Sequence, residues 1–388
     1  METQVIEEGE IKLEVPKLEN FRTSSKEYVP SKTQVFFNPV MEISRDLSVS
    51  SLNVLGEDIE SLRICDSLAG VGARGLRYSA ELGNISKVVV NDWNPKATKL
   101  IRKNVKLNEL SRVEVRNEEA NTMLYNHRPR FHVIDVDPFG TPVPFLDSSF
   151  SAISRRGILL VTATDTGPLC GAYQKACLRK YGAWPLRTSY SREIGLRILI
   201  GSVQRRAAGY DLALTPVLSH ATQHFFRIHF EVDQGAKKAD EIIKRQGYIS
   251  HCYDCGKRTL RKGWLPSLPE TCECGRDFDH AGPLWLENFA EKKHLEKVLE
   301  DLHSRDFGSI ERGTKILNSC LDEADGPPLF YDLHKVSSRA KSSPPKLKYV
   351  LKKLKKSGYF ASKTHFSNTG IRTDASIEVL TGIVAGDD

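Results

Sequence analysis

The stretch Gly70-Val71-Gly72-Ala73-Arg74-Gly75 decides the fold of this chain, because it joins an apolar strand-like run to an amphipathic helix-like run. These runs cover residues 62–68 and 75–82. Gly70 and Gly72 allow a tight turn and let the backbone come close to a ligand. Asp92 ends the next strand-like run, where its carboxylate can accept hydrogen bonds from ribose hydroxyls. A mere tight turn would give the same motif, but the strand–helix–strand context favours a cofactor that contains a nucleoside.

Strand-like and helix-like runs continue to alternate after this motif. The strand candidates are residues 62–68, 87–92, 113–116, 131–136, 158–162, 212–218 and 225–232, and the helix candidates are residues 75–82, 95–108 and 191–208. This order predicts an α/β fold with a doubly wound, mainly parallel, Rossmann-like sheet. The loop 219–224 is too short for a crossover helix, so the last two strands should pair antiparallel at the sheet edge.

A second motif, Asp135-Val136-Asp137-Pro138-Phe139-Gly140, follows an inner strand candidate. The carboxyl ends of strands in an open α/β sheet line the ligand crevice. A carboxylate and a backbone carbonyl at this place can accept the two N–H groups of an exocyclic amine and orient its lone pair for methyl transfer. Phe139 can stack on the base that carries the amine. The alternative is an ordinary β-turn, since Asp-Pro and Phe-Gly are common turn dipeptides.

Other motifs lie at both ends of the chain: Phe36-Phe37-Asn38-Pro39, Arg45-Asp46, Thr364-His365 and Arg372-Thr373-Asp374-Ala375. With these and Asp137-Pro138-Phe139-Gly140, the chain resembles the tRNA (guanine-N2)-dimethyltransferases that modify guanine-26, over nearly its whole length. The resemblance implies a class I S-adenosylmethionine-dependent methyltransferase fold with an additional C-terminal domain. It also implies transfer of one or two methyl groups to the N2 amine of that guanine.

The resemblance assigns roles to individual residues. Asp137 would be the catalytic acceptor, assisted by the Pro138 carbonyl, and Phe36 and Phe139 would hold the guanine. The residues that would contact the cofactor are Arg45, Gly70, Gly72, Arg74, Asp92, Glu119 and Ala120. Glu119 departs from the Asp that the family usually has at this position. From the sequence alone, Arg45 and Arg74 could equally form surface ion pairs, and Phe36 could equally be a core residue.

Four of the eight cysteines form a compact group, Cys252-x-x-Cys255 and Cys272-x-Cys274. This spacing is typical of a closed, structural zinc site with four thiolates. Gly256 and Gly275 follow the second cysteine of each pair, where a knuckle turn requires a small residue. A redox disulfide is the alternative. His251 and His280 lie near these cysteines in the sequence, and either could replace a cysteine as a ligand.

The net charge of +7 is concentrated near the C-terminus, since residues 335–372 hold 11 basic and no acidic residues, which leaves −4 for the rest. Within this block, residues 346–356 have a helical pattern, with Leu347, Val350, Leu351 and Leu354 on one face and lysines around it. Residues 359–362 and 377–381 are expected to form a hairpin wing. We therefore expect a winged-helix-like unit that binds the tRNA backbone. A solvated amphipathic helix is the alternative.

These patterns predict three parts: an N-terminal segment (1–60) that covers the active site, a methyltransferase domain (61–235) and a C-terminal tRNA-binding domain (240–388). The last contains the zinc module (248–282), and residues 233–238 form a linker. No apolar run is long enough for a membrane helix, and the acidic N-terminus argues against a secretory signal, so we expect a cytoplasmic enzyme. Two other functions remain open: an amino-methyltransferase acting on another base of DNA or RNA, and a non-catalytic, nucleotide-sensing regulator that binds nucleic acid.

Overall fold

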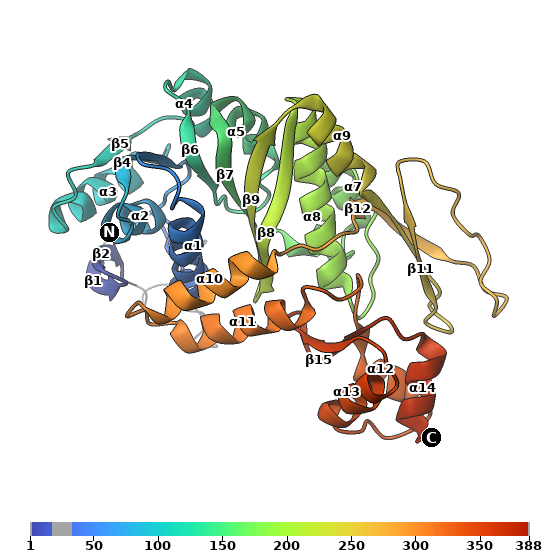
Figure 1. The fold of residues 1–388 in the computed structure, drawn as a ribbon. Helices are drawn as coiled ribbons and strands as arrows, with labels where there is room; N and C mark the ends of the chain where they lie inside the picture. The colour runs from blue at the N-terminus through green and yellow to red at the C-terminus, as the bar shows by residue number, and fades with distance from the viewer. Residues whose placement is uncertain (1, 18–32, 387–388) are drawn as a thin grey trace.

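The computed structural model describes residues 2–17 and 33–386, and Figure 1 shows their arrangement. A seven-stranded sheet with the order β5-β4-β3-β6-β7-β9-β8 forms its centre. The strands are β3 (Leu62–Asp66), β4 (Ile85–Asn91), β5 (Val113–Arg116), β6 (Phe131–Val136), β7 (Ile153–Ala163), β8 (Leu212–Thr222) and β9 (Phe225–Gln234). β3 to β7 pair in parallel, whereas β9 pairs antiparallel with β7 and β8. The predicted sheet and its antiparallel edge are confirmed.

Helices alternate with these strands. They are α2 (Ala73–Glu81), α3 (Pro95–Leu107), α4 (Ala120–Asn126), η4 (Val143–Phe145), α5 (Leu146–Ala152), α6 (Thr166–Leu169), α7 (Gln174–Tyr181) and α8 (Ser191–Ala208). The sequence signals explain where they begin. Asn94 caps α3 by accepting a hydrogen bond from the backbone N–H of Lys96 at 3.0 Å, and Pro95 takes the first helical position. The three helices predicted from periodicity are confirmed to within two residues at their ends.

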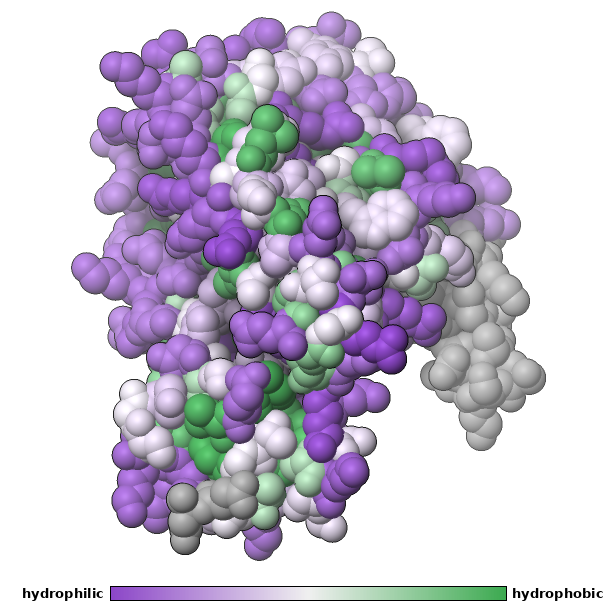
Figure 2. Space-filling view, turned by 90° about the vertical axis from the view of Figure 1, so that its right-hand side faces the viewer, coloured by the Kyte–Doolittle hydropathy of each residue, from purple (hydrophilic) through white to green (hydrophobic). Residues whose placement is uncertain are grey.

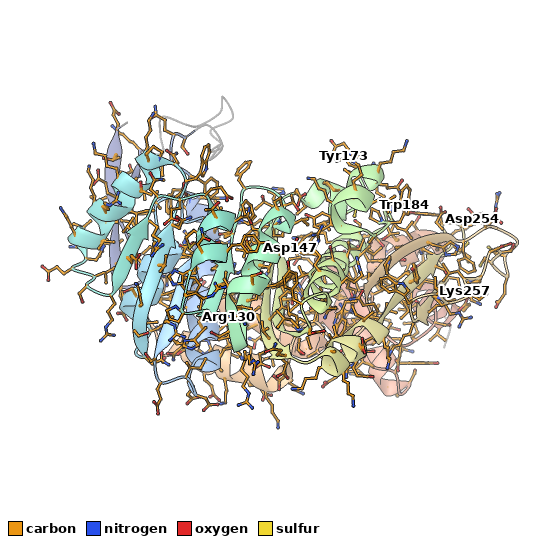
Figure 3. The ribbon with its side chains drawn as sticks, turned by 90° about the horizontal axis from the view of Figure 1, so that it is seen from above. Arg130, Asp147, Tyr173, Trp184, Asp254 and Lys257 are labelled. Atoms are coloured by element: carbon orange, nitrogen blue, oxygen red, sulfur yellow. The ribbon has the colours of Figure 1, made fainter. Side chains whose placement is uncertain are left out.

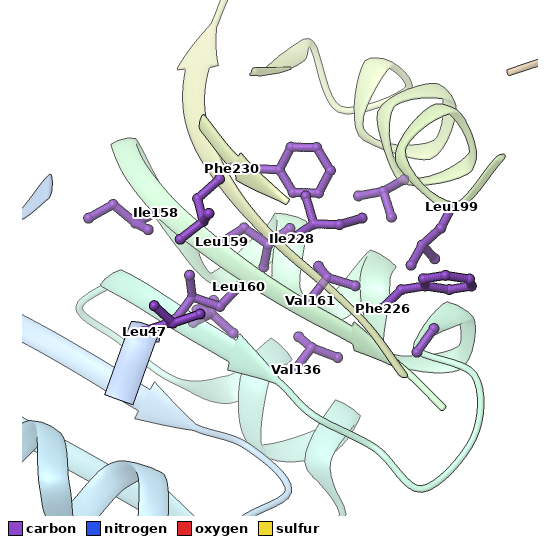
Figure 4. Packing of buried hydrophobic residues seen from close by; sticks show 14 of the residues in the cluster. Leu47, Val136, Ile158, Leu159, Leu160, Val161, Leu199, Phe226, Ile228 and Phe230 are labelled. Carbon is purple, nitrogen blue, oxygen red and sulfur yellow. The ribbon is translucent and has the colours of Figure 1, made fainter. Parts of the chain in front are cut away.

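The inner strands contain runs of consecutive buried apolar residues because other elements cover both faces of the sheet. In β4, Val88, Val89 and Val90 are all fully buried although consecutive side chains point to opposite faces. Figure 4 shows how β7 and β9 pack, with Leu160 and Ile228 among the apolar side chains at their interface. This packing fixes the ends of β3, β4 and β6, where the glycine loop, Asp92 and Asp137 follow.

The N-terminal part contains more regular structure than the extended leader that its sequence suggests. β1 (Thr3–Glu8) and β2 (Ile11–Pro16) form a hairpin, and η3 (Pro39–Met41) leads into α1 (Glu42–Leu55). Ten residues of α1 are buried, including Ser44, Ser48 and Ser51. A helix that is buried with several of its serines has no clear apolar stripe, so its periodicity does not reveal it.

After the sheet, the chain builds the cysteine module and two further helices. The elements are α9 (Ala236–Lys244), β10 (Gln246–His251), β11 (Arg258–Lys262), β12 (Asp279–Trp285), α10 (Lys292–His303) and α11 (Ile310–Glu323). Residues 233–238, predicted as a linker, are instead regular structure, because β9 continues to Gln234 and α9 begins at Ala236. α9 packs on α8 and β8, and α10 and α11 pack on α1. One apolar cluster therefore extends from the sheet through α10 and α11.

The C-terminal unit has a small apolar core of its own. It comprises β13 (Tyr331–Asp332), α12 (Leu333–Arg339), α13 (Leu347–Lys356), β14 (Ala361–Thr364), β15 (Ser367–Thr373) and α14 (Ile377–Ala385). The helix predicted at 346–356 is confirmed, but the strand predicted at 377–381 is wrong, since these residues begin α14. The hairpin is formed by β14 and β15 instead. Ser376 caps α14, and Ile377, Leu380 and Val384 are buried at helical spacing.

The face of the molecule drawn in Figure 2 is mainly hydrophilic. On this face, apolar side chains form only small patches between polar ones. In the described part of the chain, no helix is both long enough and apolar enough to cross a membrane.

A buried ionic network joins the C-terminal unit to the catalytic sheet. Arg372 on β15 donates to both carboxylate oxygens of Glu193 on α8, at 2.9 and 3.0 Å, and to Glu323 on α11 at 2.9 Å. Glu323 also accepts from His365. Desolvation raises the pKa of the Glu193 carboxyl, but the opposite effect of Arg372 and Arg197 is larger. The net result is a pKa lowered to about 2. Glu193 stays ionised because Arg372 and Arg197 both pair with it, and Glu323 stays ionised beside Arg372.

We expect Arg372→Leu to lower the free energy of unfolding by about 3–5 kcal/mol, because buried Glu323 would lose its guanidinium partner and buried Glu193 would keep only Arg197. Urea denaturation followed by circular dichroism measures this change. Arg206→Leu is the control, since Arg206 pairs with Asp147 at 3.6 Å on the surface and such pairs contribute at most about 1 kcal/mol. Equal losses in the two variants would contradict the role of the network.

Candidate active site

A cleft of about 400 Å³ opens where β3, β4 and β6 end. Three short segments that follow these strands contribute to its wall, together with the segment before η3. The lining residues are Thr33, Gln34, Phe36, Leu68, Gly70, Asp92, Trp93, Asn94, Ala97, Asp137, Pro138, Phe139 and Phe145. The structure thus brings together the glycine loop, Asp92, Phe36 and the Asp-Pro-Phe turn, as the sequence predicts.

The glycine loop has the backbone shape that its sequence predicts. Gly70 and Gly72 have φ angles of +57° and +86°, which glycine adopts without strain. A Cβ atom at Gly70 would lie 2.6 Å from the backbone oxygen of Phe36, so only glycine fits at this position. Asp92 accepts a hydrogen bond from the backbone N–H of Gly70 at 2.8 Å and from that of Asn94 at 2.8 Å. The loop and the carboxylate are therefore held as one unit.

Asp92 can still bind a ligand, because each carboxylate oxygen has a second lone pair. Burial raises the pKa of its carboxyl, although the two backbone N–H groups act in the opposite direction. The cleft therefore offers a desolvated acceptor next to apolar Leu68 and Ala97. This arrangement fits a ribose whose hydroxyls donate to Asp92 and whose base lies against apolar atoms.

Asp137 lies in the cleft and is oriented by Arg74. Nε of Arg74 donates to Oδ2 of Asp137 at 2.6 Å, and the rest of the guanidinium reaches the hydroxyls of Ser44 at 3.1 Å and Ser48 at 3.5 Å. Both side chains of the ion pair are largely buried. Among the described residues, Oδ1 of Asp137 has no hydrogen-bond partner. One carboxylate oxygen is thus anchored and the other is open to a substrate amine.

The turn that carries Asp137 is held at its other end by β7. Gly140 donates to the hydroxyl of Thr164 at 2.7 Å and accepts from the backbone N–H of Thr164 at 2.9 Å. Gly140 has a φ angle of +104°. The turn is therefore a fixed part of the sheet edge, in contrast to an exposed β-turn.

Phe36 and Phe139 face each other at the mouth of the cleft. Their ring centroids are 5.7 Å apart and the rings are close to perpendicular. Phe139 is 72% exposed and Phe36 is 36% exposed, so neither ring is a core residue. Exposed aromatic rings beside a carboxylate suit the binding of a flat heterocycle.

Arg45 lies in the wall behind this cleft and is paired within the protein. Its guanidinium donates to both carboxylate oxygens of Glu8, each at 2.5 Å, and to the backbone oxygen of Asn38 at 3.2 Å. Desolvation raises the pKa of the Glu8 carboxyl, but Arg45 and Arg77 outweigh it, and the net pKa is lowered. Glu8 belongs to the N-terminal hairpin, so this hairpin is attached to the wall of the site.

Glu119 and Ala120 lie at the start of α4. The Glu119 carboxylate caps this helix by accepting from the backbone N–H groups of Asn121 at 3.0 Å and Thr122 at 2.8 Å. Ala120 is buried. Neither residue lines the cleft described above, and the capping bonds occupy both oxygens of Glu119.

Some site residues are absent from the sequence predictions. Trp93 is 75% exposed at the cleft. Its position directly after Asp92, at the end of a strand, could have predicted it as a site residue. Gln34 and Asn94 also line the cleft. Glu8, Ser44 and Ser48 support the two arginines from elements that no local pattern connects to them.

The four cysteines of the predicted zinc site converge. All four are free thiols, and their sulfur atoms lie within 4.8 Å of one another. Two pairs, Cys252–Cys274 and Cys255–Cys272, are each separated by 3.5 Å. Zn–S bonds of about 2.3 Å place tetrahedral sulfurs roughly 3.8 Å apart, so these positions fit a zinc ion.

The neighbouring histidines are engaged elsewhere. His251 contacts the hydroxyl of Tyr190 at 2.9 Å, and His280 contacts that of Ser250 at 2.9 Å. Gly256 and Gly275 have φ angles of +78° and +84°, as the knuckle turns require. In this module the four thiols therefore make up the candidate zinc ligands, without either histidine.

Comparisons with known proteins agree with this geometry. The family described as N2,N2-dimethylguanosine tRNA methyltransferase matches residues 9–385. A tRNA (guanine(26)-N(2))-dimethyltransferase from Methanosphaera stadtmanae is 41% identical, over 99% of this chain and 97% of that protein. One from Methanobrevibacter smithii is 40% identical, over 98% and 97%. A solved complex of Trm1 from Pyrococcus horikoshii with S-adenosyl-L-methionine is 35% identical, with a TM-score of 0.87 over 97% of this chain and 98% of that one. The chain belongs to the N2,N2-dimethylguanosine tRNA methyltransferase family.

Proposed function

We propose that this chain transfers one or two methyl groups from S-adenosylmethionine to the exocyclic N2 amine of guanine-26 in tRNA. The observation that carries the proposal is the position of Asp137, with Oδ2 anchored by Arg74 and the carboxylate next to the ring pair Phe36 and Phe139. The named functions of the relatives support the same reaction. tRNA occurs in the cytoplasm, and we propose that compartment.

The site compensates for the weak nucleophilicity of the amine. The lone pair of this nitrogen is delocalised into the guanine ring. Asp137 and the backbone carbonyl of Pro138 accept its two N–H groups, which turns the lone pair out of conjugation and towards the methyl group. When bound, S-adenosylmethionine supplies that methyl group on a positively charged sulfur. As the N–C bond forms and the S–C bond breaks, Asp137 accepts the proton that the nitrogen loses.

Dimethylation needs the same acceptor twice. After the first transfer the amine still has one N–H, which must rotate to meet Asp137. Phe36 and Phe139 leave the mouth of the cleft open, since both rings are partly exposed. We propose that this opening accommodates the first methyl group during the second transfer.

Several residues are assigned to the cofactor. Gly70 and Gly72 let the backbone approach it, and Asp92 accepts hydrogen bonds from its ribose. Arg74 and Arg45 line a small pocket beside the cleft, where their guanidiniums would lie near the cofactor's carboxylate tail. The backbone around Ala120 would contact the adenine, while Glu119 caps α4 at this end of the site.

The C-terminal region, residues 240–388, is proposed to bind tRNA, and the cysteine module within it is proposed to hold a structural zinc ion. α13 presents exposed Lys348, Lys352, Lys355 and Lys356 around the buried Val350 and Leu354. The methyltransferase domain would cover residues 61–235, with residues 1–60 over the active site. The part of that segment at 18–32 lies outside the described residues.

We expect Asp137→Asn to lower methylation of tRNA by at least about 100-fold, because the amide cannot take up the proton. Tritium transfer from labelled S-adenosylmethionine, with mass analysis of the nucleosides, measures the rate and identifies the base. Cofactor and tRNA binding should stay within a few-fold of the unchanged protein. Asp147→Asn is the control, since Asp147 lies on α5 outside the cleft. Product on adenine or cytosine would favour the alternative amino-methyltransferase, and full activity of Asp137→Asn would contradict the mechanism.

We expect the combined change of Lys352, Lys355 and Lys356 to Gln to weaken tRNA binding and to reduce its salt dependence. Each lost phosphate contact removes about 0.7–0.9 from the slope of log K against log salt. Fluorescence anisotropy at several salt concentrations measures the slope, and cofactor affinity should not change. An unchanged slope would show that this lysine face is merely solvated.

We expect one zinc ion per chain, measured by mass spectrometry of the metal content. The double variant Cys255→Ser and Cys272→Ser should lose the zinc and melt at a lower temperature, because a structural site stabilises its fold. Cys170→Ser, which changes a cysteine outside the module, should keep the metal. Zinc retained by the double variant, or none in the unchanged protein, would contradict the assignment.

A further inference from the structure

The connection between β7 and α8 carries an unusual charge pattern. Residues 166–192, which extend two residues into α8, contain five basic residues and no acidic ones, namely Lys175, Arg179, Lys180, Arg187 and Arg192, and are flanked by Asp165 and Glu193. The connection includes α6 and α7 and lies outside the C-terminal basic block. None of the roles assigned above uses it.

One end of this connection is attached to the catalytic turn. Thr164, which holds Gly140, is followed by Asp165. Asp165 accepts a hydrogen bond from the hydroxyl of Tyr181 at 2.5 Å and from Lys180 at 2.9 Å. α7 is therefore fixed beside the turn that contains Asp137.

The other end is attached to the cysteine module. Trp184 and Gly282 exchange backbone hydrogen bonds at 2.8 and 2.9 Å. The hydroxyl of Tyr253 donates to the backbone oxygen of Arg187 at 3.4 Å, and Arg339 of α12 donates to the backbone oxygen of Tyr253 at 2.9 Å. The connection thus bridges the catalytic cleft and the region proposed to bind tRNA.

The exposed side of the bridge combines cations with aromatic rings. Lys175, Arg179 and Arg187 are exposed, and none of them forms an ion pair with a carboxylate in residues 2–17 or 33–386. Tyr173 is 66% exposed and Trp184 is 37% exposed. Figure 3 shows both on the upper edge of the view, whereas Arg130 lies towards the opposite edge.

Tyr173 is held as a platform. A Cβ atom on Gly167 would lie 3.1 Å from Cε2 of Tyr173, so the ring lies against the backbone of Gly167. A ring supported from below presents its other side to solvent with little loss of side-chain entropy on binding.

We propose that this surface, defined by Tyr173, Lys175, Arg179, Trp184 and Arg187, binds the tRNA strand beside the target guanine. The cations contact phosphates and Tyr173 stacks on an unpaired base, the combination by which proteins bind single-stranded nucleic acid. The proposal rests on the function proposed above. It adds that tRNA is held next to the cleft as well as at the C-terminal unit, so the guanine is positioned from two sides.

The test compares two triple variants of the full chain. The first variant removes the proposed phosphate contacts by Lys175→Gln, Arg179→Gln and Arg187→Gln. The control variant removes three exposed cations from other parts of the surface, by Arg130→Gln, Arg155→Gln and Lys237→Gln. The first set should raise KM for tRNA at least tenfold and lower the salt slope of tRNA binding by about two. kcat at saturating tRNA and the affinity for S-adenosylmethionine should stay unchanged.

The aromatic contact is tested separately. Tyr173→Ala should weaken tRNA binding about tenfold, whereas Tyr173→Phe should bind as the unchanged protein does, because stacking needs the ring and not the hydroxyl.

An unchanged salt slope and KM in the first triple variant, or equal effects of the control set, would overturn the proposal; the surface would then be solvated or would bind a protein. If the unchanged protein binds tRNA but does not methylate guanine, the proposed function fails, while the binding comparison still tests this surface.

Discussion

A buried ion pair between Asp135 and Arg227 holds the carboxyl end of β6, and the turn that carries Asp137 depends on it. Two nitrogens of Arg227 lie 2.7 Å from the two oxygens of Asp135. Tyr78 of α2 donates to the same carboxylate at 2.6 Å, and Ser48 of α1 accepts from Arg227 at 3.0 Å. Four elements far apart in sequence meet at a carboxylate two residues before Asp137. Since removing one partner of such a pair costs about 3–5 kcal/mol, the turn has little freedom to move.

Each ionised carboxylate near this pair has a guanidinium partner. Desolvation opposes the ionisation of Asp135, but Arg227 and Arg74 hold the pKa of its carboxyl below the usual value. Arg74 is also the partner of Asp137. Burial, together with the charge of Asp135, raises the pKa of the Asp66 carboxyl to about 8, so this third carboxyl is protonated at neutral pH. Two guanidiniums thus face two carboxylates, and Asp137 stays available as an acceptor.

The parts of the molecule that would bind tRNA depend on the same principle. The C-terminal unit has only a small apolar core, and its attachment to α8 goes through the Glu193–Arg372 network. Positive charge is found on α13 and on the connection between β7 and α8. The block that contains α13 is visible in the sequence, because residues 335–372 hold 11 basic and no acidic residues. The second block is less visible, because apolar residues such as Leu178 and Leu186 separate its cations.

The sequence by itself determined the sheet, the ends of α2, α3, α8 and α13 to within two residues, the glycine loop, the Asp137 turn and the cysteine group, because each depends on residues that are neighbours in the chain. Spacing, caps and turn glycines act over a few residues, and they can be read without a fold. The Glu119 cap of α4 and helix α14 also depend on neighbouring residues, namely Asn121 and Thr122 after Glu119 and the cap Ser376 before α14, but the sequence predictions did not include them. The tertiary structure decided the partners of Arg45 and Arg74 and the burial of helix α1. These features depend on contacts over dozens of residues, where desolvation makes the choice of counter-ion decisive and local pattern has no influence.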